Sequence, residues 1–211
     1  MQFTIDSHSM QLYHQYMEQL ISIAAGNSKL GRIPNVSLVP GRDCGNCAHC
    51  VKACYARKFF KMYPSVRTAW SKNSVAAHSS LRLYFRAIDA YIAKRAPKYF
   101  RFHVAGDILS QTYLGNMCKL ARRYPGTAFL AFTKMHGLDY SNLPSNLTIV
   151  ASMWPNQPIP AAVANLPKAW MQDGSETRIP ADAIPCPGTC DQCGMCWALP
   201  QLGRDVVFHK H

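Results

Sequence analysis

Cysteines fall in two short runs, one near each end of this 211-residue chain. The early run has the spacing C-x2-C-x2-C-x3-C, and the late run has the mirrored spacing C-x3-C-x2-C-x2-C. Thiolates at intervals of three residues can converge on one inorganic core from a single loop, as they do in iron–sulfur proteins. The sequence therefore predicts metal binding, with a [4Fe-4S] cluster at each run as the favoured arrangement. The eight predicted ligands are Cys44, Cys47, Cys50, Cys54, Cys186, Cys190, Cys193 and Cys196.

Zinc and disulfides are the alternatives to iron–sulfur clusters. Structural zinc also takes four thiolates, but its usual sites join two C-x2-C pairs across a longer stretch. Tight runs suit a cubane better, because its iron atoms are spread apart. Disulfides are least favoured: residues 1–8 lack a basic segment followed by an apolar one, so we expect a protein that stays in a reducing cytosol. Thiols stay reduced in that compartment.

The pairing of ligands with clusters is open at this stage. In two-cluster ferredoxins the outlying cysteine of each run, followed by proline, serves the other cluster. Here Pro187 follows Cys186, whereas Tyr55 follows Cys54. Either each run closes its own cluster, or Cys54 and Cys186 exchange partners, or one run holds a cluster and the other holds zinc or nothing. The ninth cysteine, Cys118, is expected to be a small buried hydrophobe.

The elements that position these runs alternate between helix and strand. Helices are predicted from apolar residues at helical spacing, and strands from short runs rich in β-branched and aromatic residues. The predicted helices cover 11–25, 51–63, 66–74, 77–95 and 111–124, and the predicted strands cover 35–39, 99–105, 127–133, 146–152, 168–172 and 205–208.

Near-continuous apolar strands separated by helices indicate an α/β fold, with a parallel sheet flanked by helices as an open sheet or a partial barrel. A length of 211 residues and 48% hydrophobic content fit one domain over 1–211. Within it we expect an N-terminal helix in 1–30, the sheet and its helices in 31–180, and a cysteine segment in 181–211. No run of eighteen apolar residues occurs, so we expect no membrane span.

Parallel α/β sheets gather ligands at the carboxyl ends of their strands. The cysteine loops are expected there, and five further residues end or follow predicted strands. Asp107 could bind an amine, accept a proton or cap the helix that follows it. Lys134 could offset cluster charge or bind an anion, or it could be an ordinary surface lysine. The predicted ligand-binding residues are Gly106, Asp107, Thr133, Lys134 and Trp154.

Some histidines and tryptophans also have a predicted role. We expect His103 to be a hydrogen-bonded core histidine. His49, inside the early run, could donate to a cluster sulfur, and Trp154 and Trp197 could shield clusters from water.

Positive charge is concentrated in one part of the sequence. Between Lys52 and Arg101 there are twelve Lys or Arg and one acidic residue, Asp89, within a chain of formal net charge +12. Such an excess favours nucleic acid or another polyanion as a partner. The alternative is a solvated basic helix face. No nucleic-acid motif with its own mechanism accompanies the charge.

The order strand, cysteine loop, helix, strand resembles the radical S-adenosylmethionine enzymes, with Gly106-Asp107 at the position of their substrate-binding turn. The resemblance implies a cubane with one iron open to S-adenosylmethionine. The early run departs from it, because a fourth cysteine would occupy that iron. S-adenosylmethionine is therefore not supported by the cysteine spacing. The late run contains C-x3-C-x2-C, but at the other end of the chain and again with a fourth cysteine, Cys196.

A second resemblance covers the chain from about residue 29 to its end. The early run followed by Tyr-Ala, Gly106-Asp107 with Tyr113, Ala131-Phe-Thr-Lys134, the late run and the ending Val207-Phe-His-Lys-His211 are similar to the phage gene-product-eighty-eight family. This resemblance implies a phage or bacterial cytoplasmic protein with a metal-bearing α/β domain. It implies no reaction.

Three functions from different classes remain. The first is a reductive or radical iron–sulfur enzyme that acts on a ligand at the strand ends, with an electron donor as partner. The second is a nucleic-acid-binding or redox-sensing protein in which the clusters are structural. The third, plain electron transfer, fits the length and the basic charge least well.

Overall fold

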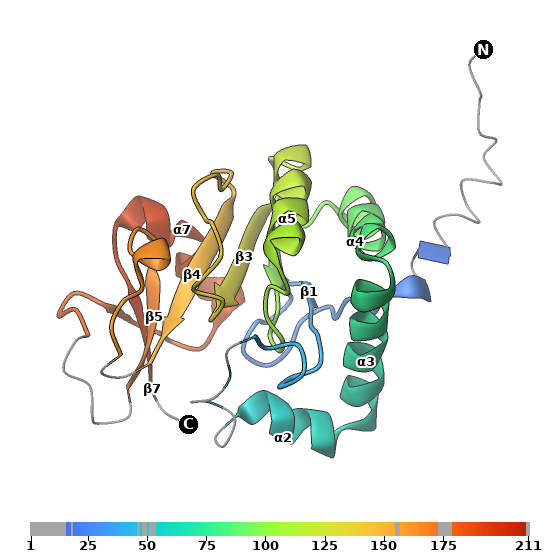
Figure 1. The fold of residues 1–211 in the computed structure, drawn as a ribbon, viewed down its shortest axis with the longest axis horizontal. Coiled ribbons are helices and arrows are strands. Elements are labelled where there is room, and N and C mark those ends of the chain that lie inside the picture. The colour runs from blue at the N-terminus through green and yellow to red at the C-terminus, as the bar shows by residue number, and fades with distance from the viewer. Residues whose placement is uncertain are drawn as a thin grey trace, which may run out of the picture.

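The chain folds around one open sheet of seven strands, and every neighbouring pair in it is parallel (Figure 1). This computed structural model describes residues 16–17, 19–45, 47, 50, 54–154, 157–172 and 179–209. The sheet order is β1-β2-β3-β4-β5-β7-β6. The strands are β1 (Asn35–Val36), β2 (Tyr99–Phe102), β3 (Ala128–Thr133), β4 (Leu147–Met153), β5 (Lys168–Gln172), β6 (Ile184–Pro185) and β7 (Val206–His209).

The parallel α/β fold predicted from the sequence is confirmed, and the sheet is open rather than a barrel. The predicted strands at β3, β4, β5 and β7 agree with the structure to within one residue at each end. The predicted strand 99–105 is too long, because His103 has a φ of 59°, which an extended strand does not accommodate. The predicted strand 35–39 is also too long, and the two-residue strand β6 was not predicted.

Six α-helices are described over their whole length, together with a short 3-10 helix at Ala161–Val163. They are α2 (Tyr55–Met62), α3 (Pro64–Ser79), α4 (Leu81–Arg95), α5 (Gln111–Arg123), α6 (Cys190–Cys193) and α7 (Met195–Leu202). The predicted break between 74 and 77 is wrong. Helix α3 continues to Ser79, and Ser80 begins α4 by accepting a hydrogen bond from the backbone N–H of Leu83 at 3.3 Å.

The predicted N-terminal helix 11–25 lies partly outside the described residues. Its described part is helical at 16–17 and 19–20, but the prediction that it reaches Ala25 is wrong. Ala24 instead forms an antiparallel bridge with Asn35, with two backbone hydrogen bonds of 2.9 Å. Pairing with β1 therefore replaces the last helical turn.

Two layers cover the sheet. Side chains along a strand point alternately to its two faces, so neighbours on β3 enter different cores. Phe129 packs in the larger core with α3, α4 and α5, which lie side by side in Figure 1. Leu130 packs on the other face against Trp197 of α7 and Leu30. The late cysteine run thus belongs to the layer on this second face. In the described part of the chain, every helix is too short or too polar to cross a membrane.

Candidate metal centres

The early cysteine run begins beside a buried carboxylate, that of Asp43. Its side chain is fully buried, and its neighbours come from the end of β1 and from α3. The partners are the backbone N–H of Val39 at 2.9 Å, the Nε of Arg42 at 3.1 Å, the hydroxyl of Ser74, and the Nε2 of His78 at 2.9 Å. This network fixes the start of the early run between the sheet and α3.

Burial alone raises the pKa of Asp43. Hydrogen bonds from Ser74, Arg42, His78 and Val39 outweigh burial, and the pKa lies below its ordinary value of 3.8. Sequence reasoning missed Asp43. The only local signal was its position directly before Cys44, because Ser74 and His78 lie 31 and 35 residues away.

A second buried carboxylate, that of Asp107, joins the ends of β2 and β3. Its Oδ1 accepts from the hydroxyl of Thr133 at 2.7 Å and from the backbone N–H of Ile108 at 2.7 Å. Its Oδ2 accepts from the backbone N–H of Lys134 at 2.8 Å. Burial raises the pKa of Asp107 more than these bonds lower it. A carboxylate has about four accepting positions, so most of them are occupied by the protein itself.

The alternative prediction that Asp107 caps the following helix is wrong. Ser110 caps α5, since its hydroxyl accepts from the backbone N–H of Tyr113 at 3.2 Å. Asp107 instead reaches the early run through its own backbone N–H, which donates to the carbonyl of Asp43 at 2.8 Å.

Two glycines let the early run approach these strand ends closely. A Cβ added at Gly106, where φ is 83°, would lie 2.6 Å from the Cβ of Leu38. A Cβ added at Gly45 would lie 2.0 Å from the Sδ of Met135, just after β3. The early run therefore lies against the carboxyl ends of β2 and β3, as the fold prediction expected.

Lys134 brings a positive charge to the early cysteines. Its Nζ lies 5.4 Å from the ring centroid of Trp154, at the end of β4. Burial raises the pKa of Cys44 and of Cys50, and the charge of Lys134 opposes that rise at both thiols. The five residues predicted to bind a ligand are therefore brought together beside the early run. Ligand binding by them stays a prediction.

The early thiols are half-buried and contact the backbone of their own loop. The Sγ of Cys44 accepts from the backbone N–H of Gly41 at 3.4 Å. The Sγ of Cys50 lies 3.6 Å from the carbonyl oxygen of Cys47. The predicted role of His49 falls outside the described residues.

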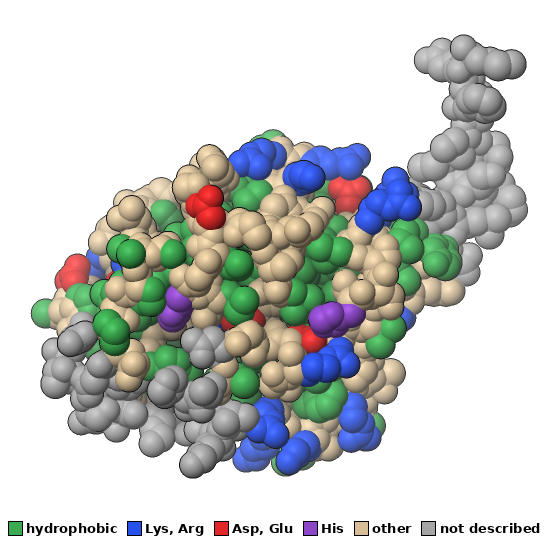
Figure 2. Space-filling view, in the orientation of Figure 1, with side chains coloured by type: hydrophobic (Ala, Val, Ile, Leu, Met, Phe, Trp, Pro, Cys, Tyr) green, Lys and Arg blue, Asp and Glu red, His purple; other side chains and the backbone are tan. Residues whose placement is uncertain are grey.

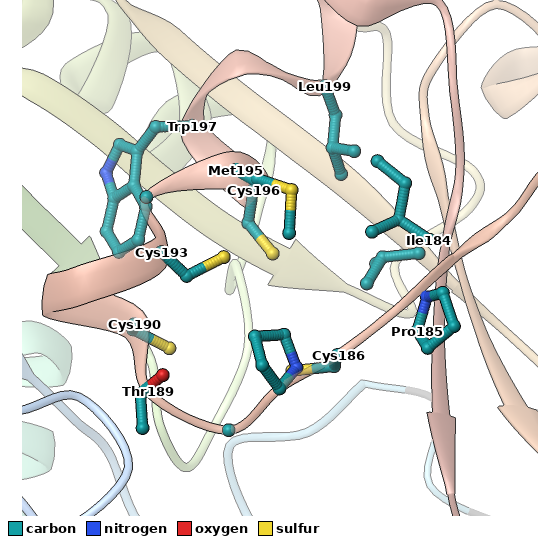
Figure 3. A pocket seen from close by; sticks show the side chains of 14 residues that line it. Ile184, Pro185, Cys186, Thr189, Cys190, Cys193, Met195, Cys196, Trp197 and Leu199 are labelled. Atoms are coloured by element: carbon teal, nitrogen blue, oxygen red, sulfur yellow. The ribbon is translucent and has the colours of Figure 1, made fainter.

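The late cysteines line a single pocket on the second face of the sheet. Figure 3 shows the sulfur atoms of this run directed toward the middle of the pocket, with Trp197 and Leu199 beside them. The cavity has a volume of about 20 Å³, which is the space of about one water molecule. Its four sulfur donors are those of Cys186, Cys190, Cys193 and Cys196.

Backbone hydrogen bonds hold both ends of this pocket. Cys186 directly follows β6, and its N–H donates to the carbonyl of Val207 on β7 at 2.9 Å. The N–H of Cys190 donates to the carbonyl of Lys29 at 2.9 Å. The run therefore starts at a strand end, as predicted, and then crosses the face of the sheet as α6 and α7.

Burial raises the pKa of Cys196 to about 12, and the neighbouring thiols of Cys186 and Cys190 add to the rise. The guanidinium of Arg101, on β2, opposes it. Arg101 lies 4.7 Å from the ring centroid of Phe132, and its buried Nε has no hydrogen-bond partner among the described residues. A metal cation would supply the positive charge that a buried thiolate at this pocket lacks.

Where burial raises the pKa of a cysteine in either run, the other cysteines that add to the rise belong to the same run. Cys47 and Cys54 add to the rise in the pKa of Cys50, and the cysteines that add to the rise in the pKa of Cys196 all belong to the late run. None of the nine cysteines forms a disulfide. Within the described residues, no three Cys, His, Asp or Glu side chains are grouped tightly enough to hold one metal ion.

Two other sequence expectations concern buried side chains. Cys118 is buried in the larger core, as predicted. His103 is buried, and its Nε2 lies 2.9 Å from the hydroxyl of Tyr113, which in turn donates to Tyr84 at 3.0 Å. Burial lowers the pKa of His103 to about 3, so the ring is neutral near pH 7. Its Nδ1 has no partner in the described residues, so the predicted hydrogen bonding is only half realised.

Comparison with known proteins agrees with the resemblance seen in the sequence. The gene 88 protein of Mycobacterium phage D29 is 29% identical over 139 residues, which cover 56% of this chain and 57% of the relative. The gene 88 protein of Mycobacterium phage L5 is 27% identical over 122 residues, covering 52% and 51%. The chain thus spans just over half the length of these curated relatives. No solved structure matches. The gene product 88 family model matches residues 14–199, and the chain belongs to that family.

Proposed function

We propose that this protein is an iron–sulfur protein that holds one or two [4Fe-4S] clusters in two separate four-cysteine centres. The observation that carries the proposal is the late pocket, into which four thiols from eleven consecutive residues project. Thiolate is the ligand type that iron–sulfur clusters require, and a C-x2-C-x2-C run is a usual way to supply it. The early run has the same donor set at the ends of β2 and β3.

The cavity volume bears on the type of metal. A space of about 20 Å³ is large enough for a single ion, but the four described thiols must draw together to hold one, and a four-iron core needs the late loop to widen. Zinc at the late pocket is therefore the alternative that the test must separate.

The early centre is the better place for chemistry on a ligand. A cluster there would supply single electrons for reduction. Lys134 would attract an anionic ligand and offset the negative charge of the thiolates. Asp107 would position Lys134 by accepting a hydrogen bond from the backbone N–H of Lys134. It would not bind the ligand itself, because most accepting positions of the Asp107 carboxylate are occupied. S-adenosylmethionine forms no part of the proposal, since four cysteines leave no iron open to it.

Anaerobic purification followed by iron, zinc and acid-labile sulfide analysis tests the proposal. Two clusters give about eight iron and eight sulfide per chain, and one cluster with zinc gives about four iron and one zinc. Electron paramagnetic resonance of the dithionite-reduced protein then identifies the cluster type. A folded, colourless protein without iron and sulfide would refute the proposal.

A further inference from the structure

A groove of about 480 Å³ lies between the joint of α2 with α3 and the second face of the sheet. One wall is formed by aromatic side chains of α2 and α3. The opposite wall is formed by the turn at Asn27–Leu30 and by Arg101 and Val104 at the end of β2. We call this the aromatic groove. It lies between the two cysteine runs, since α2 follows Cys54 directly and Lys29 accepts the hydrogen bond from Cys190.

The aromatic wall is a row of rings on one side of α2. Tyr55 and Phe59 are four residues apart on α2, which places them on the same helix face, and Tyr63 follows four residues later, directly after the helix. The first two ring centroids are 6.2 Å apart, and the next two are 5.8 Å apart and stacked. The three side chains are 51%, 42% and 46% exposed. Trp70 of α3 also lines the groove and lies against Phe60.

This row is unusual for a helix on a protein surface. A single exposed aromatic residue is ordinary, but a contiguous row of three indicates a surface that contacts a partner. Tyr55 shows that the row is held in place, because its hydroxyl donates to the carbonyl of Val104 at 2.8 Å while half of its side chain remains exposed.

The opposite wall and the flanks of the groove are cationic. Lys29 lies 4.4 Å from the ring centroid of Phe208, and Arg101 lies over Phe132. The exposed side chains of Lys58 and Lys61 extend from the same helix as the aromatic row. Figure 2 shows Lys and Arg side chains gathered at the lower edge, where Figure 1 places α2. The groove therefore combines ring faces with positive charge.

We propose that the aromatic groove binds single-stranded nucleic acid. Unpaired bases stack on aromatic side chains whatever their sequence, and a cationic wall holds the phosphates. Phe59 and Tyr63 would carry the stacking, and Lys29 and Arg101 would hold the backbone. The bases of a duplex are already stacked on one another, so they cannot reach a row of rings. This gives the basic segment a definite partner and site without relying on the metal centres.

The direct test uses the anaerobically purified full chain and fluorescein-labelled oligonucleotides about fifteen nucleotides long, a length of the order of known single-strand sites. Fluorescence anisotropy is measured with oligo-dT, oligo-U and a duplex of the same length, over a range of salt. We expect both single strands to bind more tightly than the duplex, with affinity falling as salt rises. Photocrosslinking from 5-iodouridine should label Tyr55, Phe59 or Tyr63 in the unmodified protein.

Matched variants separate stacking from general charge attraction. Phe59→Ala and Tyr63→Ala should each weaken single-strand binding about tenfold. Met62→Ala, on the same helix and 55% exposed, does not line the groove and should leave binding unchanged. Lys29→Gln should weaken binding and reduce its salt dependence, whereas Lys119→Gln on α5 should not. Phe59→Tyr keeps the ring and should bind as the wild type does, and a urea unfolding midpoint of Phe59→Ala equal to that of the wild type excludes misfolding as the cause.

Three results would overturn the inference. One is equal affinity for duplex and single strand with no effect of Phe59→Ala. Another is binding of free AMP as tightly as of an oligonucleotide. The third is absence of binding together with a dimer that Phe59→Ala dissociates, which would make the groove a contact between copies of the chain. Iron and sulfide content is measured on the same samples, so a failure here is distinguishable from a failure of the cluster proposal.

Discussion

The carboxylate of Asp43 lies 2.9 Å from the Nε2 of His78, although the two residues are 35 positions apart in the sequence. This contact joins the residue before the first cysteine to the last turn of α3. The carboxylate is fully buried while the His78 side chain is 55% exposed, so the two partners should contribute unequally to stability.

Asp43→Asn should lower the free energy of unfolding by about 2–4 kcal/mol, because an amide cannot replace a buried carboxylate as acceptor for several donors. His78→Ala should cost less than about 1 kcal/mol, as expected for an exposed partner. Urea unfolding of both variants measures the difference. Equal losses would mean that the carboxylate is not the centre of the network.

The low pKa of Asp43 also predicts how stability depends on pH. The folded pKa lies below the ordinary 3.8, so the unfolded chain binds the proton more readily. The stabilising contribution is then complete above about pH 4 and is lost as the pH falls through the folded pKa. The stability difference between the wild type and Asp43→Asn should be constant near neutral pH and shrink in acid. A difference that grows in acid would contradict this assignment.

Single cysteine substitutions should separate the two centres. Cys47→Ser should remove the metal of the early centre alone, and Cys190→Ser that of the late centre alone, because the early run lies against the ends of β2 and β3 whereas the late run lines its own pocket. Cys118→Ser, in the larger core, is the control and should retain both centres. Metal and sulfide analysis gives the readout. Loss of the late centre from Cys54→Ser, or of the early centre from Cys186→Ser, would indicate that these two residues exchange clusters.

Lys134→Gln should make the reduction potential of the early centre more negative. Reduction adds an electron, and the nearby ammonium group stabilises the added negative charge. A redox titration followed by electron paramagnetic resonance measures the change. Lys119→Gln, an exposed position on α5, changes the net charge equally and should leave the potential where it is. An equal shift of the reduction potential in both variants would show that the effect comes from net charge and not from the proximity of Lys134.

Ala96→Gly should raise the free energy of unfolding by about 1 kcal/mol. Ala96 ends α4 with φ 41° and ψ 51°, a left-handed conformation that glycine adopts without steric cost. Ala93→Gly, exposed within the same helix, should lower it by about 1 kcal/mol. Thermal or urea unfolding of the two variants tests whether their free energies of unfolding change in opposite directions. Destabilisation by both substitutions would contradict the conformational argument.

Strands were easier to predict than helix boundaries in this chain. The sequences of β3 and β4 are apolar on both faces. This pattern is typical of strands in a parallel sheet that is covered by helices on both sides. The break within α3 was misplaced because Asn73 and Ser74 resemble a helix end. Their side chains instead bond to the carbonyl of Ser37 and to Asp43, contacts that local sequence does not reveal.

Cysteine spacing predicted two separate runs but not their different surroundings. The early run lies at strand ends, as expected from a parallel sheet. The late run crosses a sheet face near Arg101, a placement that depends on β7 pairing with both β5 and β6. Side chains such as Asp43 and Arg101 acquire their partners only when distant segments meet, so no local pattern could identify them.

The position of β7 constrains the order of assembly during translation. Strand β6 is an edge strand held by β7, which is made later and lies between β6 and β5. While β7 is still inside the ribosome, β6 has nothing to pair with and Cys186 lacks its anchor on Val207. Under the proposed function, the early thiols would be able to take up metal on a nascent chain. The late ones must wait until Val206–His209 has emerged.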